Sequence, residues 1–243
     1  MVMRDLTFII PIRVDTVNRL ENIIAIIKFL CSIKAFIIVV ESNTIQNNIL
    51  RRLLPRNDRI QYMFIEDDDV VFHRTKIINI ALGVVNTEFV SVWDADVLVD
   101  KIQIAESMNV LREGKADLSF PYNGIFLNTD IIIRNLYLVN HNIKKLHRFK
   151  NYMSQLYDDN FVGGAFIINM EKYRLSGFEN ENFYGWGPED LDRVLRWQNL
   201  GYIIHRSQGP MYHLCHPRDI NGCMRSEIQN KLCNQQLAYS QYL

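Results

Sequence analysis

The strongest constraint on the fold is a regular alternation of apolar runs and helical patterns between Leu6 and Trp93. The runs are predominantly apolar, as expected of strands that are covered on both faces. They are Leu6–Ile12, Ala35–Val40, Ile60–Ile65 and Glu88–Trp93. The segments between them carry apolar residues at helical spacing: Thr16–Leu30, Ile45–Leu54 and Thr75–Val85. This alternation predicts βαβ units, and therefore an α/β fold with a mostly parallel central sheet flanked by helices.

The second half of the chain has a less regular pattern. Its expected strands are Asp117–Tyr122, Phe161–Asn169 and Tyr202–His205, followed by a short segment at Met211–His216. One or two helices are expected in Asp130–Asn151, and one each in Pro188–Leu200 and Cys223–Tyr239. No internal repeat, linker or low-complexity segment divides the sequence, so residues 1–243 are expected to form a single domain.

Composition excludes several classes of protein. The 243 residues include 27 basic and 27 acidic ones, so net charge gives no argument for a nucleic-acid partner. No stretch approaches the ~20 apolar residues of a membrane span. The N-terminal apolar run is too short for a signal peptide, and four cysteines do not make a disulfide framework. We expect a cytoplasmic protein without an integral membrane segment, in which peripheral contact with the inner face of the membrane stays open.

Candidate ligand-binding residues stand at the ends of several predicted strands, at the edge where parallel sheets bind ligands. They are Pro11–Arg13, Glu41, Glu66–Asp69 and Asp94–Asp96. Two carboxylates one residue apart, Asp94 and Asp96, are costly to bury unless a divalent cation offsets their charge. Mg²⁺ and Mn²⁺ both prefer such oxygen ligands. For this pattern alone, a solvated turn is the alternative.

A second cluster lies at the start of the helix predicted from Pro188. Trp186 stands between two glycines, and Glu189 and Asp190 occupy the first turn. An exposed indole can stack on a sugar face, and a neighbouring carboxylate can accept a proton from a hydroxyl. The alternative is that the two carboxylates only stabilise the helix N-terminus.

Two imidazoles, His213 and His216, are three residues apart near a strand end and can reach one metal ion. With a carboxylate they suit Mn²⁺ better than Mg²⁺. The alternative is a structural zinc site that recruits cysteines. The candidate cysteines are Cys215, Cys223 and Cys233.

Two further motifs are candidates for ligand contacts. Phe72 and Arg74 can stack a base and offset phosphate charge, although surface residues at a helix start are the alternative. The pair Gly163-Gly164 marks either a bulge or a close approach to the backbone.

In this order the motifs resemble those of the GT-A glycosyltransferases, and within them the β-1,4-galactosyltransferase-like group. The similarity runs from Phe8 to about Asp219. It is carried by IIPIR, FHRTKIINIAL, WDADV, GGAFIINMEKYRLSGFENENFYGWGPEDLD and MYHLCHPRD.

The resemblance implies roles for these residues. The expected nucleotide-sugar contacts are Pro11, Arg13, Glu41, Phe72, Arg74, Asp94, Asp96, Gly163, Gly164 and Trp186. The expected acceptor contacts are Tyr184, Trp186, Glu189 and Asp190, of which Asp190 and Glu189 are also catalytic. The expected metal ligands are Asp96, His213 and His216. Residues 1–100 would form the nucleotide-binding half, and residues 101–243 would bind the acceptor and complete the metal site.

The resemblance also has departures. Asp15 replaces an arginine, Phe161 replaces a tyrosine that contacts the donor sugar, and Pro188 replaces a glycine. We expect a Mn²⁺-dependent inverting enzyme, with Mg²⁺ as the alternative ion, that moves galactose or N-acetylgalactosamine from a UDP-sugar to a saccharide or glycolipid acceptor. Bacterial relatives of this kind build surface polysaccharide or lipopolysaccharide. The alternatives are a retaining N-acetylgalactosaminyltransferase, a nucleotidyltransferase, and a non-catalytic sugar-nucleotide-binding subunit.

Overall fold

The computed structural model describes residues 2–218 and 220–240. A seven-stranded sheet runs through it in the order β10-β6-β9-β4-β1-β2-β3. Its strands are β1 (Leu6–Ile12), β2 (Phe36–Asn43), β3 (Ile60–Glu66), β4 (Phe89–Trp93), β6 (Leu118–Phe120), β9 (Ala165–Asn169) and β10 (Ile204–Arg206). The helices are α1 (Val17–Cys31), α2 (Ile49–Leu53), α3 (Arg74–Leu82), α4 (Lys101–Arg112), α5 (Ile131–Asn140), α6 (Ile143–Phe149), α7 (Met170–Leu175), α8 (Glu189–Asn199) and α9 (Glu227–Ser240), with 3₁₀ turns at Lys150–Tyr152 and Ile220–Gly222.

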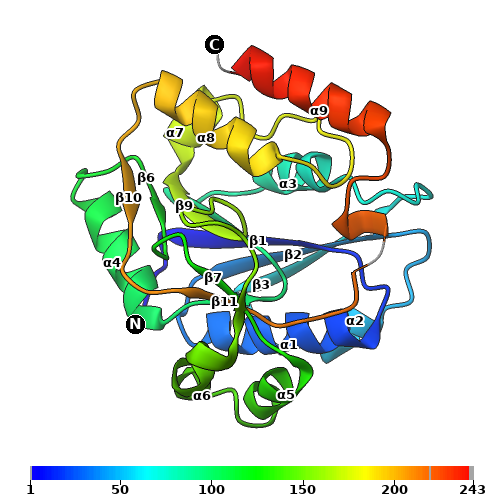
Figure 1. The fold of residues 1–243 in the computed structure, drawn as a ribbon. Helices are drawn as coiled ribbons and strands as arrows, with labels where there is room; N and C mark the ends of the chain where they lie inside the picture. Colours follow the sequence, from blue (N-terminus) through cyan, green and yellow to red (C-terminus); the bar gives the residue numbers. More distant parts are fainter. Residues whose placement is uncertain (1, 219, 241–243) are drawn as a thin grey trace.

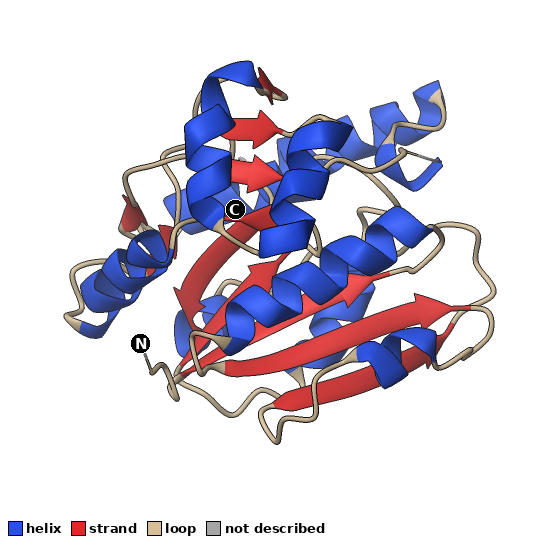
Figure 2. Cartoon of the chain, turned by 90° about the horizontal axis from the view of Figure 1, so that it is seen from below, coloured by secondary structure: helices blue, strands red, loops and turns tan. Residues whose placement is uncertain are grey.

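The predicted α/β fold with a mostly parallel sheet is confirmed. Strand β1 pairs in parallel with both β2 and β4, and β2 pairs in parallel with β3. Helix α1 lies on one face of the sheet, and α3, α8 and α9 lie on the other (Figure 1). Figure 2, which shows the molecule from below, displays the long twisted strands behind the covering helices. All four strands therefore end at one edge, which brings their terminal polar residues together.

One strand of the large sheet runs against its neighbours. Strand β9 lies between β4 and β6 and is antiparallel to both. The sequence predicted a strand from Phe161, but β9 begins at Ala165 and residues 161–164 form a loop. Because β9 is antiparallel, this loop lies at the same edge as the ends of β1 and β4.

A small sheet, which the sequence pattern did not predict, completes the site. Its order is β5-β11-β7-β8, with β5 (Val97–Leu98), β7 (Phe126–Asn128), β8 (Ser154–Gln155) and β11 (Met211–His213). Strand β11 is antiparallel to β5 and parallel to β7. The small sheet therefore joins the segment after Asp96 to the segment that carries the two histidines.

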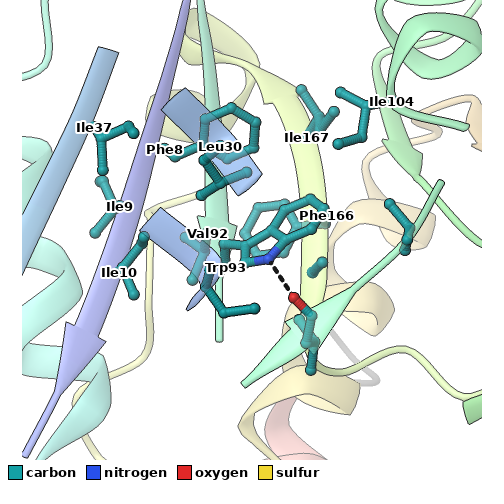
Figure 3. Packing of buried hydrophobic residues seen from close by; sticks show 14 of the residues in the cluster. Phe8, Ile9, Ile10, Leu30, Ile37, Val92, Trp93, Ile104, Phe166 and Ile167 are labelled. Carbon is teal, nitrogen blue, oxygen red and sulfur yellow. Dashed lines mark hydrogen bonds between the residues drawn. The ribbon is translucent and has the colours of Figure 1, made fainter. Parts of the chain in front are cut away.

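Contacts of Trp93 within the core hold the turn that follows β4. Trp93 is fully buried, and its ring meets Phe8 edge to face at a centroid distance of 5.3 Å. Its indole N–H donates to the carbonyl of Val97 at 3.0 Å, which ties the turn 94–96 back onto the core (Figure 3). Burial of an indole this large stabilises the fold by roughly 2–3 kcal/mol, so the turn has a fixed position.

Among the described residues, no helix combines the length and the apolar character needed to cross a membrane.

Candidate active site

A cavity of about 540 Å³ opens at the carboxyl ends of β1 and β4. Most of the predicted site residues line it: Pro11, Phe72, Arg74, Asp94, Asp96, Gly164, Trp186, Glu189, Asp190, His213 and His216. The side chains come from the turn after β4, the start of α3, the loop before α8 and its first turn, and the end of β11 with the residues that follow it. Segments that are far apart in the sequence thus meet in one cavity.

Asp96, His213 and His216 form a candidate metal centre. Strand β5 follows Asp96 directly, and its pairing with β11 aligns Val97 with His213. Oδ2 of Asp96 lies 3.0 Å from Nε2 of His216 and 3.7 Å from Nε2 of His213. One ligand atom from each of the three residues lies within 4.8 Å of the other two, as coordination of a single ion requires.

The hydrogen bonds of the imidazoles favour a metal ligand role. Nδ1 of His213 lies 2.7 Å from Oδ1 of Asn128, and Nδ1 of His216 lies 2.8 Å from the carbonyl of Pro217. Both partners are oxygen acceptors, so each Nδ1 donates, and each Nε2 faces Asp96. This fixed orientation is typical of histidines that bind a metal through Nε2.

The electrostatics of the cluster are those of a carboxylate between two bases. Burial alone would raise the pKa of the Asp96 carboxyl, but His213 and His216 outweigh it and hold that pKa below its usual value. Burial would lower the pKa of His216, yet the hydrogen bond and charge of Asp96 raise it. Asp96 is therefore ionised and available to a cation. Among the described residues, no cysteine joins this cluster, which leaves the zinc alternative without a thiolate ligand.

Arg74 connects the metal side of the cavity to the carboxylates of α8. Its Nη2 donates to Oδ1 of Asp94 at 2.7 Å, and its Nη1 lies 3.9 Å from Glu189 Oε1 and 3.8 Å from Asp190 Oδ1. Burial alone would lower the pKa of Arg74, but these three carboxylates raise it. Nη1 of Arg74 and Oε2 of Glu189 are buried and have no hydrogen-bond partner in the part of the chain that the structure describes. Buried polar atoms without a hydrogen-bond partner, next to a cavity, are suited to bond to a ligand.

Asp190 is held in place from behind. Nη1 of Arg193 donates to its Oδ1 at 2.9 Å, and Arg193 is itself fully buried and paired with Glu179 at 2.7 Å. On the other side lies Gly163, where a Cβ would approach Oδ2 of Asp190 to 2.5 Å. The glycine pair is therefore explained by close approach rather than by a bulge alone: Gly163 makes room for Asp190, and Gly164, at φ +84°, makes room for Met211.

Helix α9 supports the loop that carries Trp186. Nε2 of Gln229 donates to the carbonyls of Trp186 at 2.8 Å and Tyr184 at 3.2 Å. The indole remains 38% exposed and lines the cavity. A supported but exposed indole can stack on a sugar ring.

Four of the predicted contacts lie outside the cavity lining. Arg13 is buried and donates to the carbonyls of Ser42, Asp69 and Val70. Glu41 accepts from the hydroxyl of Tyr62 at 2.7 Å, and burial raises the pKa of Glu41. The hydroxyl of Tyr184 donates to Asp69, and Gly163 lies against Oδ2 of Asp190. Arg13 and Tyr184 thus position the loop 67–72. Glu41 is instead hydrogen-bonded to Tyr62 within the large sheet.

The cavity also has an aromatic wall, of which only Phe161 was singled out in the sequence. Tyr157 and Phe161 stack with centroids 4.3 Å apart, and Phe126 adjoins both. The two aromatic residues in the segment 157–161 were the sequence signal from which this wall could have been predicted. Arg19 also lines the cavity, one helical turn beyond Asp15, with which it pairs at 3.2 Å. An arginine thus lines the cavity four residues after the position where the resemblance lacks one.

Parts of the sequence are similar to known galactosyltransferases. A family model described as the N-terminal domain of galactosyltransferase matches residues 144–217. The chain is 40% identical to pig (Sus scrofa) beta-1,4-galactosyltransferase 5 over 63 residues, which are 26% of this chain and 16% of that protein. It is 24% identical to human beta-1,4-galactosyltransferase 7 over 164 residues, which are 66% of this chain and 41% of that protein. The chain therefore spans less than half the length of these relatives.

Solved structures show the same fold. The catalytic domain of Drosophila beta-1,4-galactosyltransferase 7, in complex with xylobiose, superposes with a TM-score of 0.60 at 16% identity, covering 95% of this chain and 79% of that one. Glucosyl-3-phosphoglycerate synthase from Mycobacterium tuberculosis, in complex with Mn²⁺, UDP and phosphoglyceric acid, superposes with a TM-score of 0.57 at 14% identity, covering 98% of this chain and 78% of that one. The chain has a GT-A fold, and parts of its sequence are similar to β-1,4-galactosyltransferases, in agreement with the resemblance of its motifs.

Proposed function

We propose that this chain is a Mn²⁺-dependent inverting glycosyltransferase, which moves a hexose from a UDP-sugar to a hydroxyl of a saccharide or glycolipid acceptor. Galactose and N-acetylgalactosamine are the favoured donor sugars, and assembly of a surface polysaccharide or lipopolysaccharide is the favoured setting. One observation carries the proposal: a single cavity contains both a carboxylate–imidazole centre and the separate carboxylate of Asp190.

The metal-binding side of the cavity would hold the UDP part of the donor. Asp96, His213 and His216 would bind the ion, and their mixed oxygen and nitrogen donor set fits Mn²⁺. A bound divalent ion there would stabilise negative charge on the departing diphosphate. A Drosophila relative of the same fold has been solved with manganese, UDP-Gal and xylobiose. Phe72 and Arg74, which also line the cavity, would contact the nucleotide.

The other side would bind the acceptor. In the proposed reaction, the acceptor hydroxyl attacks the anomeric carbon while Asp190 takes its proton. The bond from that carbon to the UDP oxygen breaks on the opposite face, so the configuration inverts and UDP leaves. Arg193 holds Asp190 in a fixed position, and Trp186 would orient the acceptor ring. Such positioning of two substrates supplies a large part of the acceleration.

Glu189 is expected to contact the acceptor in its protonated form. Burial, followed by the negative charge of Asp190, raises the pKa of Glu189 to about 8. A neutral carboxyl group can donate a hydrogen bond to an acceptor oxygen, which leaves the role of base to Asp190. Two adjacent carboxyl groups with different environments can therefore take different roles.

The test is release of UDP from a panel of UDP-sugars, with and without saccharide acceptors, in the presence of Mn²⁺ or EDTA. We expect Mn²⁺-dependent release that the correct acceptor accelerates, and near-complete loss of transfer in Asp190→Asn while Mn²⁺-dependent UDP binding survives. Asp158→Asn, in the loop before the glycine pair, is the matched control. Normal turnover by Asp190→Asn would exclude the assigned base.

The same experiment separates the alternatives. Release of pyrophosphate instead of UDP would identify a nucleotidyltransferase. A product that keeps the anomeric configuration of the donor would identify a retaining enzyme. Binding of UDP-sugars with neither transfer nor hydrolysis would identify a non-catalytic subunit.

A further inference from the structure

Helices α5 and α6 form a hairpin, residues 131–152, whose charge differs from that of the rest of the chain. From Ile131 to Tyr157 the sequence has five basic residues and no acidic residue, although the whole chain has 27 of each. Four of the basic residues are solvent-accessible: Lys144, Lys145, Arg148 and Lys150. Among the described residues, none of these four makes an ion pair. The hairpin is therefore a local cationic surface on a neutral protein.

The hairpin also exposes aliphatic side chains. Helix α5 buries Ile133 and Tyr137 on its inner side. Its outer residues Ile131, Ile132 and Val139 are 51%, 66% and 80% exposed. Ile132 and Val139 are seven residues apart, so they lie on the same face of the helix. Exposed aliphatic groups on a cationic helix pair are typical of surfaces that insert into the interface of a membrane.

Three acidic groups that contact the hairpin bond to its capping, buried or half-buried groups. Asp130 caps α5 by accepting from the amide of Ile133 at 2.7 Å, and Glu21 accepts from buried Arg134 at 2.7 Å. Asp100 lies 3.1 Å from Nε2 of His147. In these contacts the three carboxylates bond to groups other than Lys144, Lys145, Arg148 and Lys150.

The hairpin is fixed to the body of the protein. Nδ1 of His147 lies 2.7 Å from the hydroxyl of Tyr212, the neighbour of His213 on β11. Nε and Nη2 of Arg134 bond to Asn22 and Glu21 of α1. In Figure 1 the two helices lie side by side at the end of the molecule opposite α8 and α9. A ligand bound to the outer side of the hairpin would therefore leave α9 uncovered.

We propose that the α5–α6 hairpin docks the protein on anionic phospholipid bilayers. The basic side chains of α6 would contact the headgroups, while Ile131, Ile132 and Val139 would enter the headgroup–acyl boundary. The proposal rests on this surface alone and does not depend on the proposed enzymatic function.

The test is co-sedimentation of the full chain with vesicles of phosphatidylglycerol and phosphatidylcholine, compared with pure phosphatidylcholine. We expect salt-sensitive binding to the anionic vesicles only. Lys144→Gln/Arg148→Gln/Lys150→Gln should weaken the partition coefficient on the order of a hundredfold, given the usual contribution of each basic residue. Arg51→Gln/Arg52→Gln/Arg56→Gln makes the same change in net charge on exposed residues in and after α2, and should bind nearly like wild type.

The aliphatic contribution is tested separately. Ile132→Ser/Val139→Ser should lower binding, whereas Ile45→Ser/Leu53→Ser, which alters two exposed aliphatic residues near α2, should not. Unchanged far-ultraviolet circular dichroism would show that each variant is folded. Failure of wild type to bind anionic vesicles, or equal losses in hairpin and control variants, would overturn the proposal. A concentration-dependent dimer that Ile132→Ser/Val139→Ser abolishes would also overturn it, because the face would then be occupied by a second copy.

Discussion

Gly163 and Asp190 are in such close contact that no side chain larger than hydrogen fits between them. A Cβ on Gly163 would stand 2.5 Å from Oδ2 of Asp190, and it would meet the ring of Phe161 at the same distance. Arg193 holds Asp190 from the other side, at 2.9 Å. The proposed base is thus fixed between a glycine and a buried arginine.

Gly163→Ala should therefore displace the Asp190 carboxylate and lower the rate of transfer. A misplacement of about 1 Å can cost on the order of a hundredfold in rate. Mn²⁺-dependent UDP binding should be retained, because the metal ligands lie elsewhere in the cavity. The measurement is kcat alongside UDP affinity.

A double variant sharpens this prediction. If Gly163→Ala acts through Asp190, adding it to Asp190→Asn should cause little further loss, because the two changes remove the same function. If the losses in transfer rate of the two single variants added in full, Gly163 would affect the reaction by a means other than Asp190. Gly83→Ala, at the C-terminus of α3, is a matched glycine control.

Arg74→Met should destabilise the protein. The Arg74 side chain is 16% exposed and contacts Asp94 at 2.7 Å, with Glu189 and Asp190 within 4.0 Å. Removing one partner of a buried ion pair costs roughly 3–5 kcal/mol, and because Asp94 is 34% exposed the loss should lie at the lower end of that range. The check is the free energy of unfolding from urea titration.

Arg112→Met is the control for that change. Arg112 pairs with Asp5 at 2.6 Å, but both side chains are about one-third exposed. A surface pair of this kind contributes about 1 kcal/mol or less. Equal losses for the two variants would contradict the account of Arg74 as the charge that holds the carboxylates together.

The stability of the protein should fall with rising pH because of Glu189. Its pKa is raised from 4.5 to about 8 by burial and by Asp190. The folded state therefore binds more protons than the unfolded state between these values, and stability is lost as pH rises through that window. Glu189→Gln stays neutral and should be more stable than wild type at about pH 9, by an amount on the order of a few kcal/mol, but not near pH 4.5.

The check is urea unfolding of both proteins across that range of pH. Glu113→Gln, at the exposed end of α4, controls for the loss of one carboxylate. A difference between wild type and Glu189→Gln that does not change with pH would show that the Glu189 proton is not retained in the folded state.

The sequence allowed prediction of those parts of the fold whose residues repeat a pattern. Strands β1 and β2 are long apolar runs, and α1 keeps its helical spacing over 15 residues. Because parallel strands end at one edge, the position of Asp94–Asp96 beside Pro11 also followed from the pattern. Helix α4 could have been found from Asp100 and Gln103, which form a capping box.

The remaining parts depend on tertiary pairing. Strands β5 and β7 have two and three residues, too few to show a period. Their pairing with β11 determines that His213 lies beside Asp96, and no local pattern contains this information. Arg13 belongs to a predicted site motif, but three carbonyl acceptors direct it toward the loop 67–72. A motif can give the identity of a residue without giving the direction of its side chain.

The central claim is that Asp96, His213 and His216 bind the metal ion through which UDP is held. Calorimetric titration of UDP, with and without Mn²⁺, tests it in wild type and in Asp96→Asn, which keeps the size of the side chain. We expect Mn²⁺ to strengthen UDP binding to wild type, and to have almost no effect on UDP binding to Asp96→Asn. Equal strengthening in both proteins would contradict the assigned metal centre.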